Sequence, residues 1–104
     1  PMTVFKLDPA RTFEAAVDVP VHGSEAVKVK FTFKHRSREQ LEEFMQSMVG
    51  KSNAEAVMDV ASGWELTDDF NAENINKLCN NYMGAAYAIA QTYFAEIRQA
   101  RLGN

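Results

Sequence analysis

The sequence has few of the residues that build disulfides, metal sites and catalytic centres. Its 104 residues include one cysteine, Cys79, and two histidines, His22 and His35. A single cysteine excludes an internal disulfide, and without a Cys/His cluster a structural zinc site has no ligand set. The five glycines are scattered singly, so no phosphate-binding glycine motif is present. These absences predict a protein that is not an enzyme and that needs no metal or other cofactor.

Long apolar runs are also missing. The longest uncharged stretch, residues 78–95, is interrupted by asparagines, a glycine and a glutamine, which makes it a poor membrane span. The N-terminal residues 6–14 contain lysine, arginine, aspartate and glutamate, whereas a signal peptide has an apolar segment. We therefore expect no membrane segment and a protein that remains in the cytoplasm.

What is present is the composition of one ordinary globular domain spanning residues 1–104. Hydrophobic residues make up 46% and charged residues 24%, close to the averages for soluble domains. The net charge of -3 is unevenly divided, because residues 1–52 carry 8 basic and 7 acidic groups while residues 53–104 carry 3 and 7. The acidic second half argues against nucleic acid as a partner of the whole protein.

Alternating apolar residues predict a β-hairpin near the N-terminus. The odd positions of residues 13–21 are apolar, and residues 27–34 repeat the alternation after a polar loop. A period of two is typical of half-buried strands, and two such runs joined by a short loop favour antiparallel pairing. Because an isolated hairpin is only marginally stable, its apolar face must lie on the helices or on another copy of the chain. A homo-oligomer is one expectation.

Helical spacing replaces this alternation after residue 36. Ser37 with Gln40, and Ser52 with Glu55, form capping boxes that predict helices over residues 37–50 and 52–63, the second closed by Gly63.

Two more helices are predicted in the second half of the chain. Asn71 is positioned to cap a third helix, which is interrupted at residues 80–84, and a fourth runs from about Ala85 to Arg101, followed by Gly103. The predicted fold class is therefore α+β, mainly helical, with an N-terminal antiparallel β-hairpin followed by about four α-helices.

A basic strip follows the polar side of the second predicted strand and continues into the next helix. Such a strip is compatible with a solvated strand, with an acidic protein partner or self-assembly, or with nucleic acid. The predicted aromatic neighbours point to the opposite face, so the stacking platform typical of nucleic-acid sites is missing. The residues of the strip are Lys28, Lys30, Lys34, Arg36 and Arg38.

The connection at residues 64–71 carries the second set of candidate contact residues, Trp64, Leu66 and Phe70. A tryptophan after a glycine either plugs the core or anchors an interface, and tryptophan dominates binding hot spots. The acids between these residues lack the spacing of a calcium loop, so we interpret them as solvating the connection.

Cys79, Met45 and Met48 are more naturally core residues. Cys79 lies on the apolar stripe of the third predicted helix, where a buried thiol is inert. The two methionines lie on a helix stripe that is either core or an adaptable binding face.

Several strings taken together resemble one protein family. They are FKLDPARTFEAAVDVPV, FTFKHRSREQLEEF, GWELTDDFNAENI, NYMGAAYAIAQTYFAEI and ARLGN. In this order they cover nearly the whole chain and resemble the phage tail assembly chaperones of the small type encoded in prophages of Gram-negative bacteria. The family pattern often has a proline where this chain has Met83, so the start of the last helix is expected to differ locally.

The resemblance implies a non-enzymatic role in the host bacterial cytoplasm. Members of the family bind the long tape measure protein, keep it extended and soluble, help recruit tail tube protein, and are absent from the mature virion. An oligomerising helical domain that covers the apolar stripe of a long client suits this task. Two alternatives stay open, a small nucleic-acid-binding regulator that uses the basic strip, and a structural tail component that stays in the particle.

The resemblance also implies a longer form of the protein, made by programmed ribosomal frameshifting. Leu102, Gly103 and Asn104 could be encoded CTG GGA AAC, which contains the slippery heptamer G GGA AAC. We hypothesise that this chain is the short product, and the gene sequence tests the idea directly.

Overall fold

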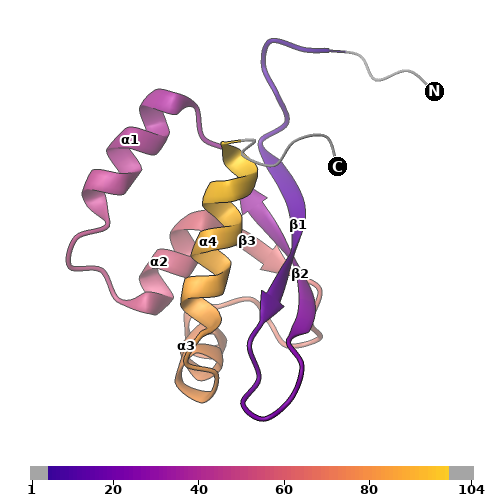
Figure 1. Ribbon diagram of the computed structural model, residues 1–104. Helices are drawn as coiled ribbons and strands as arrows, with labels where there is room; N and C mark the ends of the chain where they lie inside the picture. Colours follow the sequence, from indigo (N-terminus) through magenta and orange to yellow (C-terminus); the bar gives the residue numbers. More distant parts are fainter. Residues whose placement is uncertain (1–4, 99–104) are drawn as a thin grey trace.

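The computed structural model describes residues 5–98. The predicted hairpin is present at the N-terminal end of this range (Figure 1). Strand β1 (Thr12–Val19) pairs antiparallel with β2 (Val27–Lys34), with Val17 opposite Val29. Gly23 adopts a φ of 78° in the loop, a conformation that favours glycine. The alternating pattern therefore predicted both strands correctly, and Val17, Val19, Phe31 and Phe33 are buried in the core.

A third strand, β3 (Ala61–Trp64), pairs antiparallel with β2 and gives the sheet order β1-β2-β3. This strand was not predicted, and the prediction that Gly63 closes the second helix is wrong, because Gly63 lies within β3 opposite Thr32. The edge of β2 needs hydrogen-bonding partners, and the backbone after the helix supplies them. The pairing continues at Glu65, whose N–H donates to the Lys30 carbonyl and whose carboxylate accepts from the Lys30 N–H.

Both predicted capping boxes are present. They start α1 (Arg38–Ser47) and α2 (Asn53–Val60), where the hydroxyls of Ser37 and Ser52 each accept the backbone N–H three residues on. Gly50, with a φ of 84°, turns the chain between the two helices.

The remaining helices are α3 (Ala72–Asn81) and α4 (Ala85–Ile97). Asn71 caps α3 as predicted, since its side-chain oxygen accepts from the Asn74 N–H at 2.8 Å. Helix α4 ends at Ile97, short of the predicted end, and the predictions for Arg101, Gly103 and residues 102–104 lie outside the described residues. Gly84 precedes α4 where an added Cβ would lie 3.0 Å from Cγ of Pro20, so the hairpin loop packs closely on this junction.

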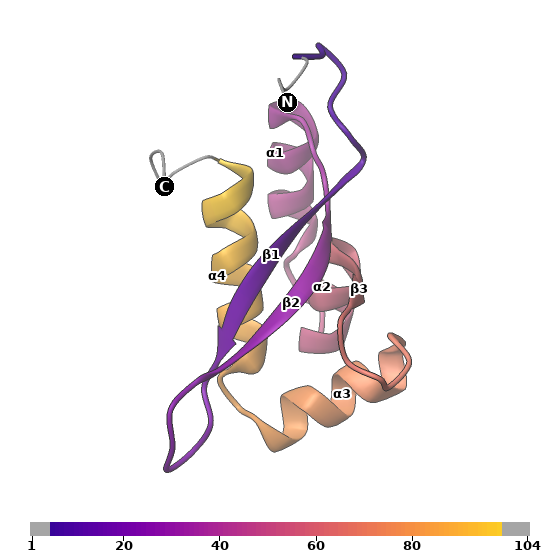
Figure 2. The ribbon, with the colours of Figure 1, turned by 90° about the vertical axis from the view of Figure 1, so that its right-hand side faces the viewer.

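The helices gather on one side of the sheet, and the core lies between (Figures 1 and 2). Helix α4 packs on β1, and α2 packs on both α3 and α4. Helix α1 stands apart in Figure 1 and reaches the core mainly through Leu41 and Phe44. The largest fully buried side chains are Tyr93, Phe31, Phe33, Ile75, Ile89, Val17, Val57 and Val60. The fold class is the predicted α+β, with a sheet of three strands.

Candidate functional site

The first two residues of the basic strip are neutralised within the sheet. Lys28 forms an ion pair with Asp18 at 2.8 Å, and Lys30 lies 3.8 Å from a carboxylate oxygen of Glu14. The hairpin register causes this pairing, because Asp18 lies directly opposite Lys28 and Glu14 is diagonal to Lys30. All four side chains are exposed, so these pairs add little stability but reduce the positive charge offered to a polyanion.

The next two residues of the strip turn toward the helices. The Lys34 ammonium donates to the carbonyl oxygen of Met58 at 3.0 Å, near the C-terminus of α2, where the helix dipole favours a cation. The Arg36 guanidinium lies 4.1 Å from the ring centroid of Phe44 and donates to the Tyr93 hydroxyl at 3.0 Å.

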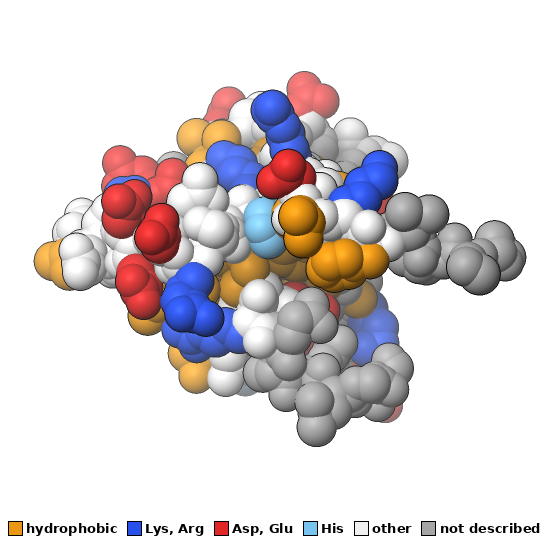
Figure 3. All heavy atoms as spheres, turned by 90° about the horizontal axis from the view of Figure 1, so that it is seen from above, with side chains coloured by type: hydrophobic (Ala, Val, Ile, Leu, Met, Phe, Trp, Pro, Cys, Tyr) orange, Lys and Arg blue, Asp and Glu red, His pale blue; other side chains and the backbone are white. Residues whose placement is uncertain are grey.

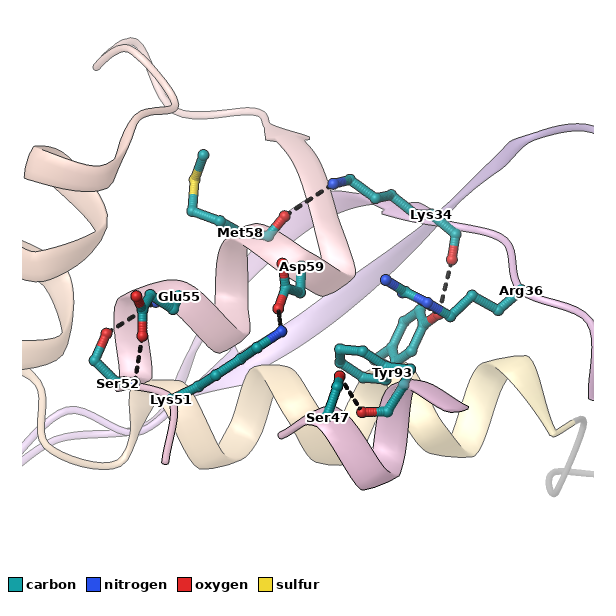
Figure 4. A network of polar contacts seen from close by, with 10 residues as sticks. Lys34, Arg36, Ser47, Lys51, Ser52, Glu55, Met58, Asp59 and Tyr93 are labelled. Atoms are coloured by element: carbon teal, nitrogen blue, oxygen red, sulfur yellow. Dashed lines mark hydrogen bonds and ion pairs between the residues drawn. The ribbon is translucent and has the colours of Figure 1, made fainter. Parts of the chain in front are cut away.

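Lys34 and Arg36 line a groove, here called the basic groove, where β2 meets α1 and α2. Figure 4 shows both side chains extending in the same direction, with Lys51 entering from the opposite side and paired with Asp59. Arg38 is exposed on α1 and lies outside this lining. The groove has a volume of about 530 Å³ and is lined by Lys34, His35, Arg36, Gln40, Glu43, Phe44, Ser47, Lys51 and Asp59.

The surface charge is mixed elsewhere too. On the face shown in Figure 3, acidic and basic side chains lie close together, with hydrophobic side chains between them. A continuous basic surface, the usual footprint of nucleic-acid binding, is not seen on the described part of this face.

Trp64 ends β3, so the predicted connection begins after it and carries Leu66 and Phe70. The Trp64 ring packs edge-on against Phe70, with ring centroids 5.1 Å apart, and against Phe31 at 5.9 Å. Its indole N–H donates to the Asp68 carbonyl at 2.7 Å, which fixes the connection over the ring. Trp64 and Phe70 are half-buried, whereas Leu66 between them is 39% exposed.

A cleft of about 230 Å³ opens where this connection meets α3. Trp64, Leu66, Leu78 and Tyr82 supply its apolar surface, and polar side chains form the rest. The predicted contact residues Trp64 and Leu66 lie in this cleft, and Leu78 and Tyr82 are lining residues that were not predicted. The full lining is Trp64, Leu66, Asp68, Asn74, Lys77, Leu78, Asn81 and Tyr82.

Cys79 is the one thiol of the chain. Cys79 packs against the core, and burial raises the pKa of its thiol, which lowers the thiolate fraction at neutral pH. No group of three His, Cys, Asp or Glu side chains within residues 5–98 is placed to hold a metal ion. Within the same range, no helix has the length and apolar character needed to cross a membrane.

Comparison with known proteins identifies a family. A family model described as phage tail assembly chaperone matches residues 2–104, essentially the whole chain. Neither the curated proteins nor the solved structures contain a significant match.

Proposed function

The chain belongs to the phage tail assembly chaperone family, and from this premise we propose that it binds the phage tape measure protein. It acts without catalysis, keeping the long client extended and soluble and helping to recruit tail tube subunits. This work takes place in the host bacterial cytoplasm, before the tail is complete.

The observation that carries this proposal is the cleft between the connection and α3. Leu66 is 39% exposed and Tyr82 41% exposed, and both lie beside the half-buried Trp64. An amphipathic client helix binds by placing apolar side chains into such a recess. Lys77, Asn74 and Asp68 at its edge offer hydrogen bonds and charges that orient the client.

A cleft of this size supports only a weak single contact. Tight binding would then come from repetition, because many copies on one long client raise the effective concentration of each contact. Weak individual contacts also suit a chaperone that must leave before the particle is finished. We accordingly propose that the chain is absent from the mature virion, and that protein analysis of purified particles will not find it.

Co-expression with the tape measure protein tests the proposal. We expect the wild-type chain to keep the client in the soluble fraction and to co-purify with it. Leu66→Asp places a charge in the cleft and should reduce the recovered client at least about tenfold, equivalent to roughly 1.4 kcal/mol.

Val49→Asp is the matched control for this substitution. Val49 is 89% exposed in the turn after α1 and does not line the cleft, so a charge there should leave client recovery unchanged. A client that is equally soluble without the chain, or equal losses with both variants, would refute binding through the cleft.

A further inference from the structure

We propose that the basic groove binds a carboxylate from an acidic segment of a protein partner. The groove lies between β2, α1 and α2, and none of its lining residues belongs to the cleft beside α3. This second site is therefore independent of the proposed client contact.

Two cations of the groove have only neutral partners among the described residues. Lys34 and Arg36 are half-buried, and their hydrogen bonds go to the Met58 carbonyl and the Tyr93 hydroxyl. Within residues 5–98 neither forms an ion pair, in contrast to Lys28 and Lys30 on the same strand. Partly desolvated cations without a counter-ion are well matched to an anion from outside.

The Arg36 guanidinium is preorganised for binding such an anion. It is stacked over Phe44 at 4.1 Å and bonded to the Tyr93 hydroxyl at 3.0 Å. Tyr93 is fully buried, and its hydroxyl in turn donates to the Lys34 carbonyl at 2.9 Å. Because the guanidinium is fixed on two sides, binding a carboxylate through its remaining N–H groups costs little ordering entropy.

The lining favours an isolated carboxylate over a nucleic acid. Glu43 and Asp59 also line the groove, and they would repel a backbone that carries a charge at every nucleotide. A peptide can place one carboxylate beside Arg36 and keep neutral or aromatic neighbours near the two acids. Phe44 itself is 6% exposed and supports the Arg36 guanidinium from below.

The test is an NMR titration of the whole chain with the peptide acetyl-Gly-Glu-Phe-Gly-amide. We expect saturable shifts at the Arg36 side-chain N–H groups and at the backbone of α1 around Phe44. The same peptide with glutamine in place of glutamate should bind at least about tenfold more weakly, since the charge-assisted bond is lost.

Two double variants with the same change in net charge supply the decisive comparison. Lys34→Gln with Arg36→Gln should weaken peptide binding about tenfold or more, whereas Lys28→Gln with Lys30→Gln should change it less than about twofold. Arg36→Lys keeps the positive charge but removes the bidentate guanidinium. This variant is a control that shows whether the loss of peptide binding in the double variant is caused only by misfolding. It should bind with intermediate affinity.

Three results would overturn the proposal. The first is the absence of binding by the wild-type chain, and the second is an equal loss in both double variants, which would indicate general electrostatics. The third is tighter binding of an oligouridylate than of the peptide, with shifts at the same residues, which would make the groove a nucleic-acid site.

Discussion

Trp64, the last residue of β3, and Leu66, in the connection that follows, are close together in the sequence, yet their side chains are in different environments. Trp64 packs against Phe31 and Phe70 and donates its indole N–H to Asp68, while Leu66 is 39% exposed at the edge of the cleft. The two residues therefore differ in role. The tryptophan fixes the shape of the surface, and the leucine is available for contact.

The largest effect is expected from substitution of Trp64. Trp64→Ala removes the edge-on packing and should lower the free energy of unfolding by about 3 kcal/mol. Urea denaturation followed by circular dichroism measures the loss. Trp64→Phe keeps an aromatic ring but removes the N–H donor, so it should cost only about 1 kcal/mol. Equal and negligible losses would mean that Trp64 does not hold the connection.

A smaller effect is expected where the connection enters α3. Asn71→Ala removes the acceptor for the Asn74 N–H and should cost about 1 kcal/mol of unfolding free energy. Asn71→Asp retains the capping oxygen and adds a charge favoured at a helix N-terminus, so its stability should match the wild type within a few tenths of a kcal/mol. The same denaturation experiment checks both variants, and a loss in Asn71→Asp as large as in Asn71→Ala would contradict the capping role.

The smallest effect concerns the reactivity of the Cys79 thiol on α3. Burial raises the pKa of Cys79, so less thiolate is present at pH 8 than in a free thiol. Iodoacetamide should therefore alkylate the folded chain more slowly than it alkylates glutathione, and urea should remove the difference. Mass spectrometry follows the reaction. Alkylation of the folded chain at the glutathione rate would contradict the packing of Cys79 against the core.

Local features of the fold could be predicted from the sequence. The hairpin follows from alternation within each strand, and the starts of α1, α2 and α3 follow from capping residues that bond to backbone three residues away. Each signal is contained in a few neighbouring residues, so no knowledge of tertiary packing is needed.

Features that depend on distant residues could not be predicted. The segment ASGW has weak strand preference, and it forms β3 because the edge of β2 is available as its partner. The residues of the basic strip also differ in their partners, and these partners are distant in the sequence. Arg36 meets Tyr93, 57 residues away, while Lys28 and Lys30 meet acids on β1. Sequence patterns place these side chains on a face but do not identify the partners there.

The most direct test of client binding at the cleft is photo-crosslinking in cells that produce the phage. A photoreactive benzoylphenylalanine at position 66 should give a covalent adduct with the tape measure protein, identified by mass spectrometry. The same group at the exposed position 49, outside the cleft, should give none. We expect an adduct from position 66 alone. Its absence, or an equal yield from both positions, would contradict client binding at the cleft.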